Sequence, residues 1–290
     1  MITLTPGQRI RATDVATAGL AFVEKRGASL PAAMIRYHWS NGDAADVITA
    51  LAAYQNADGG FGNRLEPDIH APESNPFAAR LALQVMRSVP GESSVGLRAP
   101  LGNWLGANQH DDGDWHFSEV TKAGWMQPWF AAWEFPSLNP SCCVLGLAAA
   151  NGIASKRMKS LVAELWGGKA SINQARNGSF YELLPYVEYT LGAQLPVDYL
   201  DAIAANITAV GDDYEDAGHF FDMAMGGSHE ITEGIPDHLM SRWIDRLLEE
   251  PLDDGGWPTP YDDAWRAWTT ASNLTLLARL RDYSSGTRLQ

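Results

Sequence analysis

The sequence predicts an all-α fold, an alpha/alpha toroid built from about five to six helical hairpins that supply inner and outer helices. Three observations lead to this prediction: a glycine–aromatic phrase that recurs along the chain, helical spacing of apolar residues around it, and a 46% share of hydrophobic residues, enough for a sizeable core. No linker rich in Ser, Gly or Pro is long enough to separate domains. Residues 1–290 are therefore expected to form a single toroid domain.

The recurring phrase is a glycine followed two residues later by a large aromatic. Its copies are Gly59/Phe61, Gly113/Trp115, Gly178/Phe180, Gly218/Phe220 and Gly255/Trp257, and in three of them a glutamine stands four residues before the glycine: Gln55, Gln109 and Gln174. Glycine can take the left-handed conformation that ends a helix, the aromatic can cover the last turn, and the glutamine can bond unpaired backbone groups. We call each copy a corner and expect it to mark one end of a hairpin.

Apolar periodicity and cap signals predict the helices in order. Asn75 is the expected N-cap of a helix that begins at Pro76, because proline suits the first helical position. The almost wholly apolar segment after Pro140 indicates a helix buried on all sides, which suits Cys142 and Cys143 better than a disulfide framework. The other predicted helices span residues 14–25, 43–56, 155–175, 181–192, 197–210, 236–250 and about 262–283.

Three of the corners carry a family resemblance. The segments QNADGGFG at 55–62, QHDDGDW at 109–115 and DDGGW at 253–257 are similar to the QW-type repeats of the terpenoid cyclase and protein prenyltransferase superfamily. The chain resembles the small bacterial squalene-cyclase-like and prenyltransferase-repeat proteins of that group over most of residues 43–283. This resemblance implies the toroid and suggests isoprenoid chemistry.

The chain also departs from the patterns of that superfamily. It has no DxDD motif, which class II cyclases use to protonate an alkene or epoxide. Residues 212–216 read DDYED and match the magnesium motif DDxxD, but aspartate pairs also precede two corners, so we interpret them as turn-forming. The loop after the first corner offers Asp68 and His70 without the cysteine of a prenyltransferase zinc site. No metal site is therefore predicted.

Acids and histidines recur downstream of the corners, where a toroid opens its cavity. A carboxyl group that faces an apolar cavity has a raised pKa and can act as a general acid. The predicted catalytic residues are Asp68, His70 and Asp262, with Glu66 and Asp263 beside them. The structural alternatives are a turn at Asp68, a helix cap at Asp262 and Asp263, and a satisfied loop histidine at His70.

Tryptophans away from the corners are candidates for an aromatic wall that stabilises a carbocation. The pairs 125/129 and 129/133 are expected to share helical faces, with ordinary core packing as the alternative. The predicted substrate-binding residues are Trp125, Trp129, Trp133, Trp265, Trp268, His116 and Asp222.

These residues and the resemblance favour acid-catalysed cyclisation, isomerisation or hydration/dehydration of a hydrophobic isoprenoid. A glycosidase-like hydrolase with paired rim carboxylates and a non-catalytic small-molecule binder are the alternatives. The sequence requires no cofactor, and magnesium enters only if the substrate is a diphosphate, because the predicted rim is poor in Lys and Arg.

The formal net charge of −14 disfavours nucleic acid and anionic membrane surfaces as partners. No apolar stretch approaches the ~18 residues of a membrane span, and the first residues lack the apolar core of a signal peptide. A cytoplasmic location is the expectation, and no feature specifies an oligomeric state.

Overall fold

The structure, a computed structural model, describes residues 4–89, 91 and 94–283. Sixteen α-helices occur in these residues, where β-structure is limited to two isolated bridges. The all-α prediction is therefore confirmed. None of the helices in the described part of the chain is long and apolar enough to cross a membrane.

Contacts divide the chain into two compact units. Unit 1 consists of Met1–Ala50, Ile207–Ala224 and Ile235–Gln290, and unit 2 of Leu51–Asn206 and Met225–Gly234. Unit 1 thus combines segments from both ends of the chain, whereas unit 2 is nearly continuous in sequence. The single toroid domain stays a prediction.

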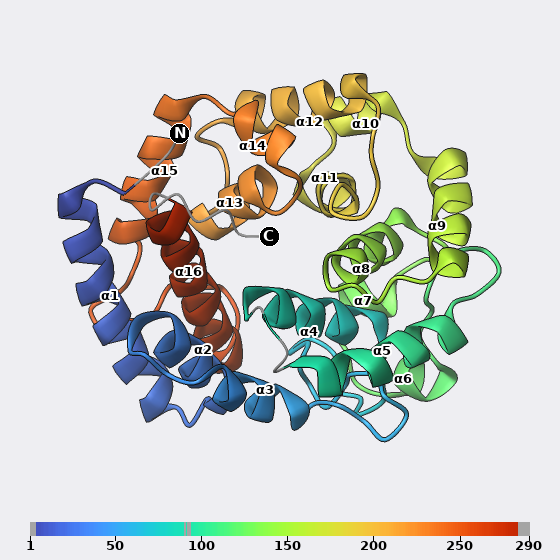
Figure 1. Cartoon of the computed structure of the whole chain (residues 1–290), viewed down its shortest axis with the longest axis horizontal. Coiled ribbons are helices and arrows are strands. Elements are labelled where there is room, and N and C mark those ends of the chain that lie inside the picture. The colour runs from blue at the N-terminus through green and yellow to red at the C-terminus, as the bar shows by residue number, and fades with distance from the viewer. Residues whose placement is uncertain (1–3, 90, 92–93, 284–290) are drawn as a thin grey trace. The chain divides into compact units, whose positions relative to one another are not determined.

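Unit 1 is organised around its last helix (Figure 1). α16 packs on α1 and α2, and α1 also packs on α15. Two bonds fix these contacts: Gln8 donates to the Asp245 carboxylate at 2.7 Å, and the Trp39 indole donates to the Leu274 carbonyl at 2.9 Å. The helices are α1 (Pro6–Lys25), α2 (Ser29–Trp39), most of α3 (Ala44–Ala52), most of α13 (Ala217–Met225), α15 (Asp237–Glu249) and α16 (Asp263–Tyr283).

Unit 2 is organised around a buried central helix, α8, which packs on α4, α9 and α11. Cys142 and Cys143 are buried in α8 as free thiols, as the sequence predicts. A Cβ on Gly146 would collide with the Glu188 carbonyl, so glycine there lets α11 approach α8 closely. The helices are α4 (Pro76–Ser88), α5 (Val95–Asn108), α6 (Glu119–Ala123), α7 (Pro128–Ala131), α8 (Leu138–Ala150), α9 (Lys156–Lys169), α10 (Ile172–Asn177), α11 (Phe180–Tyr189), most of α12 (Val197–Val210) and α14 (His229–Glu233).

The corners at Gly59, Gly113 and Gly255 share one geometry. Their φ angles are 90°, 92° and 88°, in the region that favours glycine. A Cβ at each would lie 2.5 Å from a backbone carbonyl oxygen of a neighbouring helix, namely that of Pro100 in α5, Leu161 in α9 and Ala18 in α1. The following aromatics Phe61, Trp115 and Trp257 are buried. These three corners therefore hold helices together as well as turning the chain.

Side chains complete the same corners. At two of them the glutamine Nε2 donates to the corner carbonyl and to a carbonyl of a neighbouring helix, α5 or α9. The acceptors are Gly59 and Leu97 for Gln55, at 2.9 and 3.1 Å, and Gly113 and Met158 for Gln109, at 3.1 and 3.4 Å. The aspartate before each glycine accepts a bond from the N–H two residues on, as Asp58, Asp112 and Asp254. The turn-forming interpretation of the paired aspartates at these corners is confirmed.

The corners at Gly178 and Gly218 differ, and the prediction of a left-handed helix end is wrong there. Gly178 has a φ of −67°, and its carbonyl accepts a bond from the Asn206 amide at 3.0 Å, while α11 begins within two residues. Gly218 lies inside the first turn of α13, where a Cβ would lie 2.9 Å from the Asn273 Oδ1. Close packing, not a turn, explains that glycine.

Hydrogen bonds at the helix caps explain which predicted helix boundaries are right and which are wrong. The Asn75 side chain accepts a bond from the Ala78 N–H and Pro76 opens α4, so that prediction is confirmed. The single helix predicted over 155–175 is wrong, because α9 ends at Lys169 and the Ser171 side chain caps a new helix. The helices α2, α5 and α13 were not predicted.

The helical faces predicted for the tryptophans at 125, 129 and 133 are also corrected. Trp125 lies between α6 and α7, and Trp133 lies beyond the end of α7. Gly124 ends α6 in an extended conformation, and Pro128 begins α7. Because these two residues interrupt the segment, the three rings do not belong to one helix.

Candidate functional site

Two loops of unit 2 pair and bring acids beside aromatic rings. We call residues Glu66–His70 the acid loop. The His70 N–H donates to the Trp125 carbonyl at 2.9 Å, and the Gln127 N–H donates to the Asp68 carbonyl at 3.0 Å. Ile69 and Met126 form an antiparallel bridge between these bonds. The short ladder therefore fixes the acid loop against the loop between α6 and α7.

An aromatic cluster supports the paired loops from below. It contains Ile69, Ala71, Phe77, Phe117, Met126 and Phe130, with Trp133 and Phe135 packed against it. The Phe77 and Phe130 rings meet edge to face with centroids 4.6 Å apart, a favourable aromatic geometry. Because Ile69 and Met126 belong to this cluster, it anchors both paired loops.

Two tryptophans of the segment that pairs with the acid loop have exposed side chains: Trp125 between α6 and α7, and Trp129 in α7. Trp125 is 54% exposed and Trp129 is 44% exposed, although large aromatics are usually buried. The His70 imidazole lies against the Trp125 indole, with ring centroids 3.9 Å apart. Trp133 is partly buried and donates from Nε1 to the Ser137 hydroxyl at 3.1 Å. The exposed Trp125 indole therefore lies at the His70 end of the acid loop.

Glu66 and Asp68 are a buried acid pair, with 7% and 6% of their surface exposed. Burial, with a smaller contribution from the Asp68 charge, raises the pKa of Glu66 to about 8. The bond that the Asp68 N–H donates to Glu66 Oε1 at 3.3 Å and the charge of Arg80 oppose this shift without cancelling it. Glu66 is therefore a protonated carboxylic acid at neutral pH.

A buried ion pair lies close to the acid loop. Arg80 of α4 donates through Nε and Nη2 to the two Glu188 oxygens, at 2.8 and 2.7 Å. Gln84 donates to Glu188 Oε1 at 3.0 Å. This bidentate arrangement ties α4 to α11 and holds a guanidinium where it acts electrostatically on Glu66.

A second buried carboxyl, Asp114, anchors the chain that follows the aromatic cluster. It accepts bonds from the Trp115 and Ser137 N–H groups, both at 2.7 Å, and from the Ser141 hydroxyl. Burial raises its pKa to about 6, and these bonds oppose the rise. Because Ser137 in turn accepts from Trp133, Asp114 helps to fix that indole.

Unit 2 brings six of the sequence-predicted residues into one region: Glu66, Asp68, His70, Trp125, Trp129 and Trp133. His116 is nearby in sequence to the cluster residue Phe117 and stacks on Phe135, with centroids 4.9 Å apart. It also contacts Asp112 at 2.9 Å, and burial lowers its pKa.

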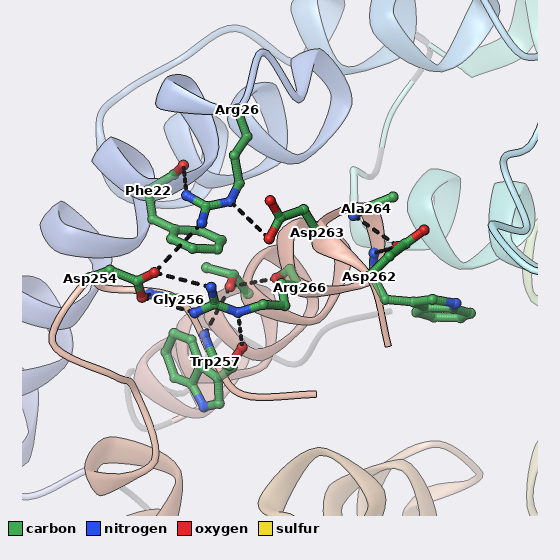
Figure 2. A network of polar contacts seen from close by, with 11 residues as sticks. Phe22, Arg26, Asp254, Gly256, Trp257, Asp262, Asp263, Ala264 and Arg266 are labelled. Atoms are coloured by element: carbon green, nitrogen blue, oxygen red, sulfur yellow. Dashed lines mark hydrogen bonds and ion pairs between the residues drawn. The ribbon is translucent and has the colours of Figure 1, made fainter. Parts of the chain in front are cut away.

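The remaining predicted residues lie in unit 1. Figure 2 shows two of them, Asp262 and Asp263, in the region of the Gly255 corner. Asp262 accepts bonds from the Ala264 and Trp265 N–H groups at 3.0 and 3.1 Å, so it caps the start of α16. Asp263 has an exposed side chain and lies 3.5 Å from Arg26 Nε. The Asp262 bonds fit the helix cap that was the alternative for both residues, whereas the Asp263 contact is an ion pair with Arg26.

At the Gly255 corner, Arg26, Arg266 and Asp254 form a charged group beside the Phe22 ring, which we call the clasp (Figure 2). Arg266 forms two bonds with Asp254, at 2.9 and 3.0 Å, and Arg26 lies 3.6 Å from the same carboxylate. Both guanidinium groups lie over the Phe22 ring, at 3.7 Å for Arg26 and 4.5 Å for Arg266. The clasp joins α1, the corner and α16 and is structural in character.

The other unit 1 candidates lie on two helices. Trp265 and Trp268 are half-buried on α16, with the Trp265 ring 5.9 Å from the Tyr261 ring, and Asp222 is exposed on α13. Among the described residues, no group of three or more His, Cys, Asp or Glu side chains could hold a metal ion.

Sequence reasoning missed Arg80, Gln84, Glu188 and Asp114. The first two were detectable, because polar residues four apart on an otherwise apolar helix share one face. From the sequence alone, Asp114 cannot be distinguished from the other aspartates of the turns, nor Glu188 from an ordinary surface glutamate. Their roles depend on the packing of α8 and α11.

No family model and no curated protein matches the chain.

Proposed function

We propose that the chain is an acid-catalysing enzyme whose substrate is a hydrophobic isoprenoid. One observation carries this proposal: the Glu66 carboxyl is buried beside Asp68 and, with a pKa of about 8, holds a proton at neutral pH. A general acid is most effective when its pKa lies near the working pH. The reaction would be a cyclisation, isomerisation or hydration/dehydration.

In this proposal Glu66 donates its proton to an alkene carbon of the substrate. The electron pair of the double bond forms the new C–H bond, and the neighbouring carbon becomes a cation. The indole faces of Trp125 and Trp129 attract that cation, and the Glu66 carboxylate recovers a proton when the cation loses one to form a new alkene. Asp68 orients the acid, and His70 contacts the bound substrate beside Trp125.

The toroid belongs to the same proposal. The QxxxGx-aromatic corners and the similarity to the terpenoid cyclase and protein prenyltransferase superfamily support a ring of hairpins around a central cavity. We place the enzyme in the cytoplasm.

A hydrolase of the glycosidase type is the second candidate. The half-exposed indoles of Trp125 and Trp129 in the region of the Glu66 and Asp68 pair also suit a sugar ring, which stacks on tryptophan. Glu66 would then protonate the leaving oxygen, and Asp68 would act as base or nucleophile.

Product analysis distinguishes these candidates. The purified protein is incubated with geraniol, farnesyl diphosphate, squalene and nitrophenyl glycosides, each with and without magnesium. Conversion of a polyene by the wild type and its loss in Glu66→Gln are the expected results, while Glu164→Gln, an exposed glutamate on α9, serves as the matched control.

Each outcome has a clear meaning. Release of nitrophenol that depends on Glu66 and Asp68 would favour the hydrolase. Binding of a substrate without any turnover, equal in the wild type and Glu66→Gln, would show a non-catalytic binder. Equal turnover by Glu66→Gln and the wild type would refute the assigned acid.

A further inference from the structure

The acid loop is part of a longer loop whose two ends are held together. The Asn75 N–H donates to the Phe61 carbonyl at 2.9 Å, and the Asn63 N–H donates to the Pro72 carbonyl at 3.1 Å. A Cβ on Gly62 would lie 2.3 Å from the Pro72 carbonyl oxygen, so the two segments are in direct contact there. Residues 61–75 therefore form a compact closed loop.

Two consecutive residues of this loop have a left-handed backbone. The φ angles of Asn63 and Arg64 are 52° and 63°, and both residues are exposed, whereas residues 65–69 after them are all buried. A left-handed residue with a Cβ is unfavourable, asparagine tolerates it better than most, and such a conformation persists where its surroundings hold it. The pair marks the point at which the chain turns inward and buries Glu66 and Asp68.

A polar network holds Asn63 in this conformation. Its Nδ2 donates to Asn56 Oδ1 at 3.0 Å, and Asn56 Nδ2 donates to the Pro72 carbonyl at 2.9 Å and to the Ser74 hydroxyl at 3.1 Å. The Ser74 hydroxyl donates in turn, at 2.7 Å, to Asp58, the turn-forming aspartate of the first corner. The network therefore connects this corner to both ends of the loop.

We propose that Asn63 is a positioning residue of the candidate site. Its left-handed backbone and its bond to Asn56 keep the loop closed, so that Glu66 and Asp68 stay buried while the loop pairs with the segment of Trp125. Asn63 acts through the loop and not by contact with a substrate. The inference rests on the proposed function only for the use that is made of the buried acid.

Two substitutions separate the backbone of Asn63 from its side chain. Asn63→Gly keeps the left-handed conformation and loses the bond to Asn56, whereas Asn63→Ala is unfavourable in that conformation and also loses the bond. Asn41→Ala is the matched control, because Asn41 is an exposed asparagine of unit 1 with a φ of 53°. It imposes the same backbone strain outside the loop. All three variants should keep the wild-type circular dichroism.

The pKa of Glu66 reports whether the loop is closed. It is measured by carbon-13 NMR of the labelled carboxyl groups, with Glu66→Gln to assign the signal. We expect about 8 in the wild type and a fall toward the ordinary value of 4.5 in Asn63→Ala, because water then reaches the carboxyl. Asn63→Gly should lie between these two proteins, and Asn41→Ala should match the wild type.

Amide hydrogen exchange gives a second readout that does not depend on titration. The His70 and Gln127 N–H groups bond across the two paired loops, so both should exchange about tenfold faster in Asn63→Ala than in the wild type. An unchanged Glu66 pKa or unchanged exchange in Asn63→Ala would overturn the proposal. A wild-type pKa near 4.5 would also overturn it, and so would equal effects of Asn41→Ala and Asn63→Ala on Glu66.

Kinetics separate this inference from the proposed acid chemistry. If the chain converts a polyene, Asn63→Ala should lower kcat by about tenfold to a hundredfold with a smaller change in KM, because a displaced acid impairs proton transfer more than binding. A fall in the Glu66 pKa in a protein without turnover would leave the positioning role standing and refute the acid chemistry. Turnover that depends on Glu66 but not on Asn63 would refute the positioning role alone.

Discussion

At Glu66 and Asp114 the number of hydrogen-bond donors decides how far burial moves a carboxyl pKa. Both residues are removed from water. Asp114 accepts from two N–H groups and a hydroxyl, and its pKa rises only to about 6. Glu66 accepts one bond, from the Asp68 N–H, so less opposes the effect of burial and its pKa rises to about 8. Each carboxyl also has a neighbouring aspartate, Asp112 or Asp68, whose charge raises its pKa. Glu66 therefore has the higher pKa of these two buried carboxyls.

Glu66 makes the folded state less stable as the pH rises. Its pKa is raised from 4.5 to about 8 by folding, so the folded state binds the proton more tightly than the unfolded chain does. Its contribution to stability is present below a pH of about 4.5 and is lost as the pH rises through about 8, at up to ~1.4 kcal/mol per pH unit.

Glu66→Gln should remove this dependence and should be more stable than the wild type at pH 8. Urea unfolding at pH 5, 6.5 and 8 measures the free energy of unfolding of both proteins. Parallel pH profiles for the two proteins would show that Glu66 ionises as freely in the folded chain as in the unfolded one.

The candidate site illustrates what the sequence can show about single residues. The position of Glu66, Asp68 and His70 shortly after a corner predicts that they lie in a loop and are candidates for a functional site. It does not place them beside Trp125, because that contact depends on the bridge between Ile69 and Met126, more than fifty positions apart. Whether the site is catalytic stays a prediction.

At the scale of elements, the corners connect neighbouring helices, and each conserved position of the phrase within this chain has its own structural role. The glycine allows a positive φ and a close helix contact, the aspartate closes the turn, and the glutamine joins two helices. These tasks are local, so the sequence could predict the corners at Gly59, Gly113 and Gly255. The helices α2, α5 and α13 were missed because their stability depends more on tertiary packing than on a clear apolar period.

Gly113→Ala tests the corner geometry. A Cβ there would lie 2.5 Å from the Leu161 carbonyl, and φ is 92°, so we expect a loss of about 2–4 kcal/mol in the free energy of unfolding. Gly167→Ala on α9 is the matched control: its Cβ meets nothing within 4 Å, and alanine in a helix should stabilise by up to ~1 kcal/mol. Equal effects of the two substitutions in urea unfolding would contradict this role of the corner.

The ion pair between Arg80 and Glu188 joins α4 to α11 where both side chains are largely buried. Glu188→Gln keeps the shape of the side chain but leaves the Arg80 charge without its partner. We expect a loss of about 3 kcal/mol, measured by urea unfolding. The exposed pair between Lys122 and Glu119 provides the comparison, since Glu119→Gln should cost less than about 1 kcal/mol. A similarly small loss for Glu188→Gln would mean that the buried pair is not a structural tie.

On the scale of the whole molecule, the sequence predicts an all-α chain, and this much is confirmed for the described residues. The composition of each unit could not be predicted, because it depends on contacts between distant segments. Gln8 bonds Asp245 and Trp39 bonds Leu274, across more than two hundred positions. Periodicity is a local signal and carries no information about such pairs.

Truncation after Pro251 tests how much unit 1 depends on α16. This change removes the helix that packs on both α1 and α2, so their buried side chains, including Phe22, Leu30 and Ile35, should become exposed. We expect the shortened chain to bind a hydrophobic dye and to lose part of its near-ultraviolet circular dichroism. Dye binding and spectrum equal to those of the full chain would show that α16 is dispensable.

The division of the chain also has a consequence for folding during synthesis. Unit 2 is almost continuous, so most of its contacts can form as soon as residues up to 206 have left the ribosome. Residues 1–50 emerge earlier but belong with segments that are made after residue 206. The nascent chain must therefore carry α1 and α2 without α16 until residues 263–283 have been made, and chaperones that shield apolar helices would be most useful during that interval.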